Sequence, residues 1–449
     1  MDPTLNKTFG RFLWSSILIA LSGCLGNVVD GVIVGNLVGA DGVSAVNLSK
    51  PVIQFMFTIS MVLAAGGSML VGMNLGRKEY PRASHIYTLS VTTSLGVGFL
   101  LTLCGLLIPD VVTGWICRSE YLWQPAYDYT LYVLLGAPAY MLMWALGIHV
   151  GVDGSPRLSS LAVVIDNVVN LLLDIVFIRY FDWGIAGSSA ATAVGHVVGI
   201  LVLMRHFLYQ DNHLHFSLST FPLLPALGSI ISQGAPLAVA SISLTLLLVA
   251  ANTIVVSTLG HTGIFAFAVC MNLLQVYNLF LSGTCRTLQS LGSIEVGKGS
   301  ADGFRQIMRL SFQFITVAMA VTCLLVWIAP GVIAMLFGAE SPEMVSETSH
   351  ALRIFAPSFI PFCYIYTMMI VYKLYGHHKM ALFISFALSL TVIPVLWLMA
   401  RAAPGSLWYS YLIAYALEVV AIVVLHKTTH ARFELVAPPN PTNKNNLSY

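Results

Sequence analysis

The sequence predicts an all-α polytopic membrane protein with twelve transmembrane helices, arranged in two six-helix bundles related by a parallel internal repeat around a central cavity. The first observation is composition: 57% of the 449 residues are hydrophobic and 9% are charged, whereas soluble domains contain about 25% charged residues. The second is a series of apolar runs, each long enough to cross a bilayer. The third is a pattern of glycines and prolines that the two halves of the chain share.

The apolar runs are bounded by charged residues, glycines and prolines, which mark where each span begins and ends. In the first half of the chain we expect spans at 12–38, 47–75, 84–108, 125–150, 158–180 and 184–206, and in the second half at 226–259, 264–297, 306–329, 347–372, 380–400 and 406–428. Because the N-terminal run is too long for the core of a signal peptide, we expect it to be retained as the first span.

The repeat becomes visible when the first half of the sequence is laid over the second. With Gly31–Asn47 placed on Asn252–Ala268, the same shift carries Pro109 onto Pro330 without a gap. Each half has six spans, an even number, so both halves enter and leave on the same side of the membrane and are parallel repeats. We therefore expect an N-terminal bundle (1–208), a cytoplasmic linker (209–225), a C-terminal bundle (226–432) and a disordered cytoplasmic tail (433–449).

Positive charge predicts the orientation. One side of the predicted membrane region collects Lys7, Arg11, Arg77, Lys78, Arg82, Arg157, Arg205, Lys298, Arg305, Arg309, Lys373, Lys379, Lys427 and Arg432, and the other has Lys50, Arg118, Arg179 and Arg401. Since cytoplasmic loops are enriched in Lys and Arg, the first side is predicted to be cytoplasmic, with both termini there, in the cell inner (cytoplasmic) membrane. The net charge of +2 and the lack of a basic stripe argue against a nucleic-acid partner.

Polar residues interrupt the apolar run 161–178. Asp166, Asn170 and Asp174 are spaced four apart, so their side chains project from one face of a helix. Acids inside a membrane span are costly and are functional candidates by default, which favours a cation site or a proton-handling site. The structural alternative is that Asp166 and Asp174 are neutral acids that join this helix to a neighbour.

Polar groups of two other spans lie at a similar predicted depth. Asp30 is eight residues from the outer end of span 1, Asp174 is six from the end of span 5, and Thr192 is eight into span 6. With a rise of about 1.5 Å per residue, all three lie roughly 9–12 Å below the outer surface. Carboxylate, amide and hydroxyl oxygens at one depth suit a hard monovalent cation, and the two carboxyls equally suit proton exchange.

Several motifs, in this order, resemble the multidrug and toxic compound extrusion (MATE) antiporters, most closely the prokaryotic DNA-damage-inducible-protein-F-like branch. They are VDGVIVGNLVGADGVSAVN in span 1, the turn GRKEYPRAS, VDGSPR before span 5, NLLLD within it, and GIAGSSAAT at the start of span 6. The resemblance implies a site built by Asp30, Asn170, Asp174 and Thr192, where Na⁺ or H⁺ from outside drives drug expulsion. Span 1 differs from the family in lacking a proline in its inner half, and Asp166 is an acid outside the family pattern.

The second half contributes candidate substrate-binding residues. Glu418 in span 12 falls on His196 in span 6 when the halves are aligned, and it either attracts a cationic substrate or pairs with Arg353 or Arg286. Arg286 faces either the cavity or lipid headgroups. Tyr277 and Met368 either offer adaptable apolar contacts to substrates or serve as packing.

The leading hypothesis is therefore an ion-coupled secondary antiporter that exports cationic or amphipathic organic compounds. The first alternative is a flippase for a lipid-linked saccharide or another polar lipid, whose cavity should hold several basic residues. The second is an intramembrane enzyme that uses Asp166, Asp174 and Mg²⁺, although such sites expect clusters of acids from two helices. We expect no enzymatic activity, no resident cofactor and no metal centre, small organic substrates and membrane lipids as partners, and a monomer.

Overall fold

The computed structural model describes residues 2–117, 120–208, 212–217, 223–337, 339, 341–402 and 404–428, and these residues contain helices but no β-strand. In the first half the helices are α1 (Pro3–Leu37), α2 (Ala40–Gly76), α3 (Tyr80–Leu107), α4 (Pro109–Ile116), α5 (Glu120–Leu135), α6 (Ala137–Val152), α7 (Pro156–Ile175), the π-helix η1 (Val176–Tyr180), α8 (Gly184–Met204) and the 3₁₀-helix η2 (Arg205–Leu208). In the second half they are α9 (Leu223–Gly297), α10 (Ala301–Ile328), α11 (Pro330–Leu336), α12 (Pro342–Leu374), α13 (His378–Leu390), α14 (Val392–Ala402), the 3₁₀-helix η3 (Pro404–Tyr409) and α15 (Ser410–Thr428).

The predicted polytopic helical fold is confirmed. Within the described residues, eleven helical segments are long and apolar enough to cross a membrane, and a twelfth span is formed if the bent pair α5 and α6 is counted as one. The two helices of that pair meet at 48°. Pro138 lies in the first turn of α6, where it has no N–H to continue the helix, and this explains a break at that point.

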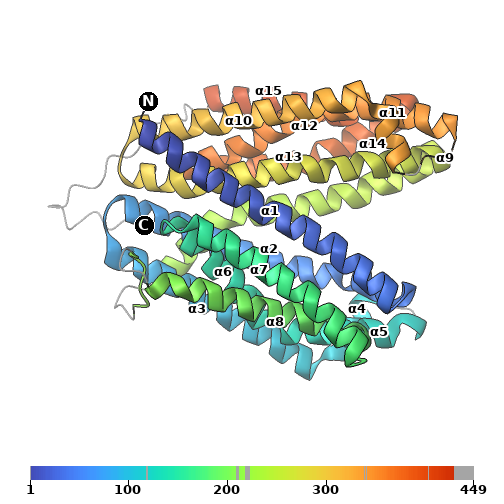
Figure 1. The fold of residues 1–449 in the computed structure, drawn as a ribbon. Coiled ribbons are helices and arrows are strands. Elements are labelled where there is room, and N and C mark those ends of the chain that lie inside the picture. Colours follow the sequence, from blue (N-terminus) through green and yellow to red (C-terminus); the bar gives the residue numbers. More distant parts are fainter. Residues whose placement is uncertain are drawn as a thin grey trace. The chain divides into compact units, whose positions relative to one another are not determined.

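Spans 7 and 8 differ from the prediction of two separate helices. The backbone from Leu223 to Gly297 is assigned as one helix, α9, of 75 residues. It contains two membrane-length apolar segments, Leu223–Leu244 and Phe265–Gly297, which correspond to the two expected spans. Figure 1 draws α9 as a yellow-green run and a yellow run.

The internal repeat is visible in the backbone angles. The residues that follow α3 and α10 are Ile108 (φ −135°, ψ 44°) and Ala329 (φ −134°, ψ 50°), and each donates its N–H to the carbonyl four residues earlier. Pro109 and Pro330 then begin the short helices α4 and α11, as expected for a residue that has no N–H to leave unpaired. The two breaks coincide when the halves are aligned by the shift predicted from the sequence.

A tight turn is also repeated. Gly154, after α6, has φ +91°, and Gly376, after α12, has φ +81°. Residues with a Cβ rarely adopt this left-handed conformation, so glycine is needed at both turns. These two positions also correspond in the alignment of the halves, once the shift is allowed its small drift along the chain.

The described residues divide into two compact units. One comprises 10–235 with 293–299, and the other comprises 2–9, 236–292 and 300–428. The boundaries predicted for the two bundles and the linker stay a prediction, and the predicted tail at 433–449 lies outside the described residues.

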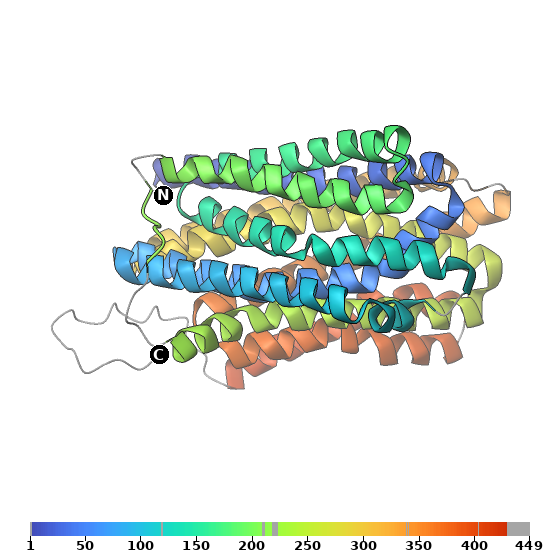
Figure 2. The same cartoon turned by 90° about the horizontal axis from the view of Figure 1, so that it is seen from below.

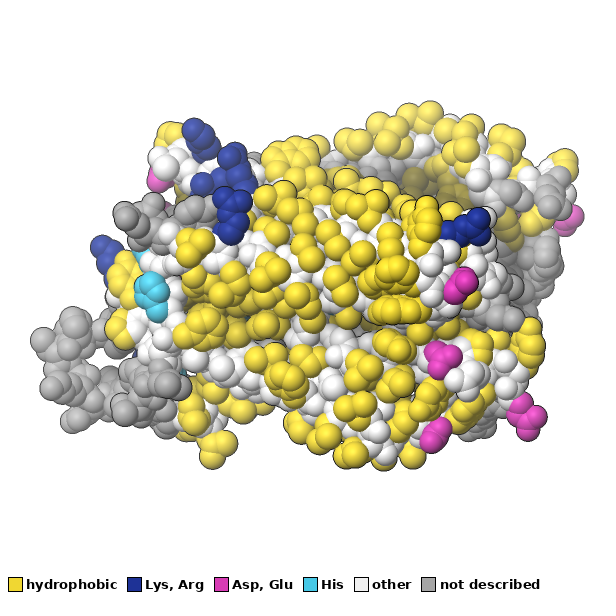
Figure 3. Space-filling view, turned by 60° about the horizontal axis from the view of Figure 1, so that its bottom comes forward, with side chains coloured by type: hydrophobic (Ala, Val, Ile, Leu, Met, Phe, Trp, Pro, Cys, Tyr) yellow, Lys and Arg dark blue, Asp and Glu magenta, His cyan; other side chains and the backbone are white. Residues whose placement is uncertain are grey.

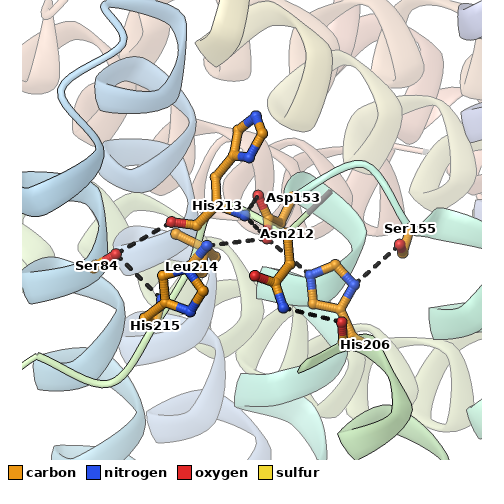
Figure 4. A network of polar contacts seen from close by, with 8 residues as sticks. All are labelled: Ser84, Asp153, Ser155, His206, Asn212, His213, Leu214 and His215. Atoms are coloured by element: carbon orange, nitrogen blue, oxygen red, sulfur yellow. Dashed lines mark hydrogen bonds and ion pairs between the residues drawn. The ribbon is translucent and has the colours of Figure 1, made fainter. Parts of the chain in front are cut away.

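The described part of the predicted linker, 212–217, is docked on the first unit. It runs as a thin green line beside the light blue α3 in Figures 1 and 2. Figure 4 shows Asp153 at the centre of the contact: its carboxylate accepts a hydrogen bond from Nε2 of His206 (2.8 Å) and from the backbone N–H groups of His213 (3.1 Å) and Leu214 (3.2 Å). Ser84 adds two backbone contacts, so this segment is held by specific bonds.

One face of the molecule shows the charge distribution expected of a membrane protein. In Figure 3 hydrophobic side chains form a broad continuous band, Lys and Arg gather mainly toward one end, and Asp and Glu gather toward the other. An exposed apolar band of this size is stable against lipid and not against water.

Candidate cation and proton site

A stripe of small and polar residues on α1 faces α7. Asn167 of α7 donates a hydrogen bond from Nδ2 to Oγ of Ser22 (3.0 Å), and its side chain covers Gly26, where an added Cβ would lie 2.7 Å from Oδ1 of Asn167. Ser22, Gly26 and Asp30 are spaced four apart and share one face of α1. This close packing therefore directs Asp30 toward α7 as well.

Asp30 and Asp174 are brought together by this packing. Their carboxyl groups lie close enough to interact electrostatically, and Tyr129 of α5 lies close enough to interact with both. Oγ of Ser188, in α8, donates to Oδ1 of Asp30 (3.3 Å). Asp174 is 0% exposed, and neither of its carboxylate oxygens forms a hydrogen bond of normal geometry. A buried acid without hydrogen-bond donors is suited to receive a proton or a cation.

The next turn toward the predicted cytoplasmic side is neutral and polar. Nδ2 of Asn170 donates to Oγ1 of Thr192 (3.0 Å), and Oγ1 of Thr192 donates to the backbone carbonyl of Ser188 (3.1 Å). These bonds connect α7 and α8, which run alongside each other in Figures 1 and 2. The carbonyl oxygen of Asn170 and the hydroxyl of Thr192 add neutral oxygen atoms next to the two acids.

A third pair lies one further turn along the same two helices. Nδ1 of His196 lies 2.9 Å and 3.1 Å from the two carboxylate oxygens of Asp166. Gly195 permits this approach, because a Cβ at this position would lie 2.7 Å from Oδ1 of Asp166. We call the three levels, Asp30 with Asp174, Asn170 with Thr192, and Asp166 with His196, the polar ladder.

A small cavity, which we call the ladder cavity, lies beside the polar ladder. Its volume is about 60 Å³, and its walls come from α2, α5, α6 and α8. Tyr129, Thr192, Tyr140 and His196 are among the residues that line it, so it touches all three levels or their immediate neighbours. Its walls are mostly apolar, with polar groups supplied by tyrosine and threonine hydroxyls and by His196, and a cavity of this size has room for a few water molecules at those groups.

The backbone changes directly after Asp174. α7 ends at Ile175 and continues as the π-helix η1 (Val176–Tyr180). π-Helical turns are uncommon and frequently occur at functional sites. No pattern in the sequence predicted this turn.

The structure thus places the predicted coupling residues Asp30, Asn170, Asp174 and Thr192 together in one unit. Asp166 lies on the same face of α7 as Asn170 and Asp174, but it pairs with His196, which was predicted to bind substrate. Two neighbours were missed, Ser188 and Tyr129. The spacing of four between Ser188 and Thr192 was the available signal for the serine, whereas no pattern identified Tyr129.

The other substrate candidates lie in the second unit. Glu418 is 1% exposed, and neither of its carboxylate oxygens accepts a hydrogen bond, so no hydrogen bond with Arg353 or Arg286 is formed. Tyr277 is buried and packs its ring 4.6 Å from that of Phe359. Arg286 and Met368 are partly buried. Their assignment to substrate binding stays a prediction.

Comparisons with known proteins agree with this architecture. The sequence profile of a family described as MatE matches residues 16–176 and 236–398. The multidrug export protein MepA of Staphylococcus haemolyticus is 22% identical over 420 residues, 92% of this chain and 91% of that protein. MepA of Staphylococcus aureus is 24% identical over 272 residues, 59% of each chain.

Solved structures show the same fold. The MATE transporter VcmN of Vibrio cholerae superposes with a TM-score of 0.86 at 19% identity, covering 95% of this chain and 97% of that one. A MOP superfamily transporter from Pyrococcus furiosus superposes with a TM-score of 0.85 at 17% identity, covering 95% and 96%. The DNA-damage-inducible-protein-F-like branch stays a prediction. Because the family profile matches more than half of the chain, the protein belongs to the MATE (MatE) family.

Proposed function

We propose that this protein is a secondary antiporter that exports cationic or amphipathic organic compounds in exchange for H⁺ or Na⁺. The observation that carries the proposal is the fully buried carboxylate of Asp174, which forms no hydrogen bond of normal geometry and lies beside a second acid, Asp30. Two adjacent acids in a membrane bundle are strongly destabilised when both are charged, so a bound proton or monovalent cation stabilises them. The names of the relatives, which are multidrug export proteins, support export as the direction and drugs as the substrate class.

Coupling requires that the ion favours one conformation over another. A ligand shifts a conformational equilibrium only by its difference in affinity for the two states. Asp30 lies on α1, a helix of 35 residues without an internal proline, and Asp174 lies where α7 changes into a π-helix. A proton or cation that joins these two helices would therefore favour the arrangement in which α1 and α7 are close, and its release would allow them to separate.

We further infer a cytoplasmic location for both termini, in the cell inner membrane, and a monomeric transporter. The orientation rests on the Lys and Arg asymmetry of the loops. The segregation of charge in Figure 3 supports it.

One observation favours the flippase alternative. Lys373, near the end of α12, is 0% exposed, and its Nζ has no hydrogen-bond partner. A buried ammonium group without a partner is suited to an anionic group such as the phosphate of a lipid headgroup. Transport of a fluorescent lipid with an anionic headgroup, lost in Lys373→Met, would support this alternative. Retention of lipid transport in that variant would remove the reason for it.

The antiport proposal is tested in proteoliposomes with ethidium as the organic cation and with pH and Na⁺ gradients imposed separately. We expect one of the two gradients to drive ethidium into the vesicles through transporters that are inserted inside-out. Asp30→Asn or Asp174→Asn should abolish the uptake that depends on the gradient. Asp110→Asn, which alters an acid outside the polar ladder in α4, is the matched control and should transport normally. Ion-coupled transport at the wild-type rate in both ladder variants would contradict the proposal.

A further inference from the structure

We propose that His196, oriented by Asp166, is a second proton-carrying group, and that protons pass between it and the Asp30–Asp174 pair along the ladder cavity. The inference rests on the proposed antiport function and deepens it, since it selects the proton as a coupling ion. It also reassigns His196 from substrate binding to coupling.

The geometry gives the two residues different roles. Both carboxylate oxygens of Asp166 lie within 3.1 Å of Nδ1 of His196, so Nδ1–H donates to the carboxylate and the ring is held in one orientation. A fixed Nδ1–H leaves Nε2 as the nitrogen that can accept and release a proton. Asp166 is thus a positioning residue, and Nε2 of His196 is the proton-carrying atom.

Nε2 of His196 is available for this role. It is buried, and it has no hydrogen-bond partner among the described residues. The His196 side chain lines the ladder cavity. A purely structural ion pair between α7 and α8 needs only Nδ1. It does not account for a buried Nε2 without a hydrogen-bond partner, since buried polar atoms are normally paired.

The distance between the two acid levels is short enough for a water-assisted path. Asp166 and Asp174 are eight residues apart on one helix face, which is about 12 Å at 1.5 Å per residue. Thr192 lies between the levels, and a hydroxyl can both donate and accept a hydrogen bond. The ladder cavity, of about 60 Å³, is lined by His196, Thr192 and Tyr129, the neighbour of the two outer acids, and it has room for the few waters that the transfer needs.

The transfer is balanced in atoms and charge. The N–H bond at Nε2 of the imidazolium breaks, the proton passes along hydrogen-bonded water, and an O–H bond forms on the carboxylate of Asp30 or Asp174. The imidazole becomes neutral, and one acid of the outer pair becomes neutral. No oxidant, reductant or co-reactant is required.

The surroundings of His196 favour a proton over a metal cation. Tyr140 of α6 packs its ring 5.4 Å from the imidazole, and Tyr129 and Tyr132 of α5 line the same cavity. The cavity residues from α2 are the apolar Ile53 and Met56, and the described cavity lining contains no Lys or Arg. Imidazole nitrogen binds protons readily, whereas hard cations such as Na⁺ prefer oxygen ligands.

The test measures how many protons are exchanged for each ethidium molecule. In proteoliposomes this number follows from the pH gradient and the membrane potential at which the net ethidium flux reverses direction. We expect His196→Gln to exchange one proton fewer than the wild type while still transporting ethidium, and Asp166→Asn to shift the pH profile of transport. His350→Gln, an exposed histidine of α12, is the matched control and should keep the wild-type proton number. Nuclear magnetic resonance of ¹³C-labelled histidines in the wild type, with His196→Gln for assignment, supplies a measurement that needs no active variant.

The results separate this inference from the proposed function. Wild-type transport driven by Na⁺ alone, or an unchanged proton number in His196→Gln, would overturn the role of His196 and leave antiport intact. A His196 resonance that does not change with pH would overturn it as well. If neither gradient drives wild-type transport, the antiport proposal itself fails.

Discussion

Replacing Asn170, Asp174 and Thr192 of the polar ladder by the residues at the equivalent positions of the second repeat should preserve the fold and remove ion coupling. The alignment of the halves that joins His196 to Glu418 also places Val392 on Asn170, Leu396 on Asp174 and Ala414 on Thr192. All three counterparts are 0% exposed in their own unit. The same positions of one architecture are therefore polar in one half and apolar in the other, so helix packing alone does not require the polar residues.

The magnitude follows from the contacts that the triple variant Asn170→Val, Asp174→Leu, Thr192→Ala removes. Removing the buried carboxylate of Asp174, which has no hydrogen-bond donor, should raise the free energy of unfolding by about 1–3 kcal/mol. The lost bond between Asn170 and Thr192 is worth about 0.6 kcal/mol, the average for polar pairs between membrane helices. We therefore expect a net gain in stability of roughly 0.5–2.5 kcal/mol, as found when buried polar sets are replaced together by apolar residues.

The assay is thermal denaturation in detergent, followed by the fraction of monodisperse protein, alongside ion-driven ethidium transport in proteoliposomes. The expected result is a melting temperature at or above that of the wild type with no gradient-driven transport. A clear fall in melting temperature would show that the ladder is part of the structural core. Gradient-driven transport that survives would show that coupling lies elsewhere, and either result would refute the reasoning.

Three further outcomes follow from single contacts. Gly195→Ala should destabilise the protein by about 1–3 kcal/mol because its Cβ would meet Asp166, whereas Gly96→Ala, with nothing within 4 Å, should not; melting in detergent measures both. Asp153→Ala should release the segment 212–217, since two backbone N–H groups lose their acceptor, and limited proteolysis should then cleave the linker faster. Glu418→Gln should weaken export of cationic probes more than export of neutral ones, and equal losses in the transport assay would indicate a structural role.

The sequence was sufficient to predict the fold because the bilayer and the repeat leave strong patterns. Membrane spans need long apolar runs, and the backbone breaks at Ile108 and Ala329 precede prolines that recur at a fixed shift. The association of Asp30 with Asp174 was also accessible, since depth along a straight helix can be counted in residues. The direction of each helix and the position of each residue along it were enough to predict both the fold and the association of Asp30 with Asp174.

The pairing of Asp166 with His196 was not accessible in the same way. The two residues are 30 positions apart on different helices, and they meet because Gly195 lets α8 approach α7 closely. Residue number alone predicts neither how far a helix is rotated about its own axis nor which side chains of two helices meet. The π-helical turn after Asp174 was missed for a related reason, because it depends on packing and not on a local sequence signal.

If the protein is the ion-coupled antiporter proposed above, the charge of the polar ladder limits how many ions one cycle can exchange. Three carboxyl groups, with a neutral imidazole, carry three negative charges, and a buried net charge of that size is unstable in a membrane bundle. Three protons or monovalent cations restore neutrality: two at Asp30 and Asp174, and one on Nε2 of His196. If Na⁺ occupies the outer level and the proton of the imidazole is not exchanged, at most two ions exchange, whereas a protonic path through the cavity allows three. The number of ions exchanged in each transport cycle therefore indicates which levels of the polar ladder can be reached from both sides of the membrane.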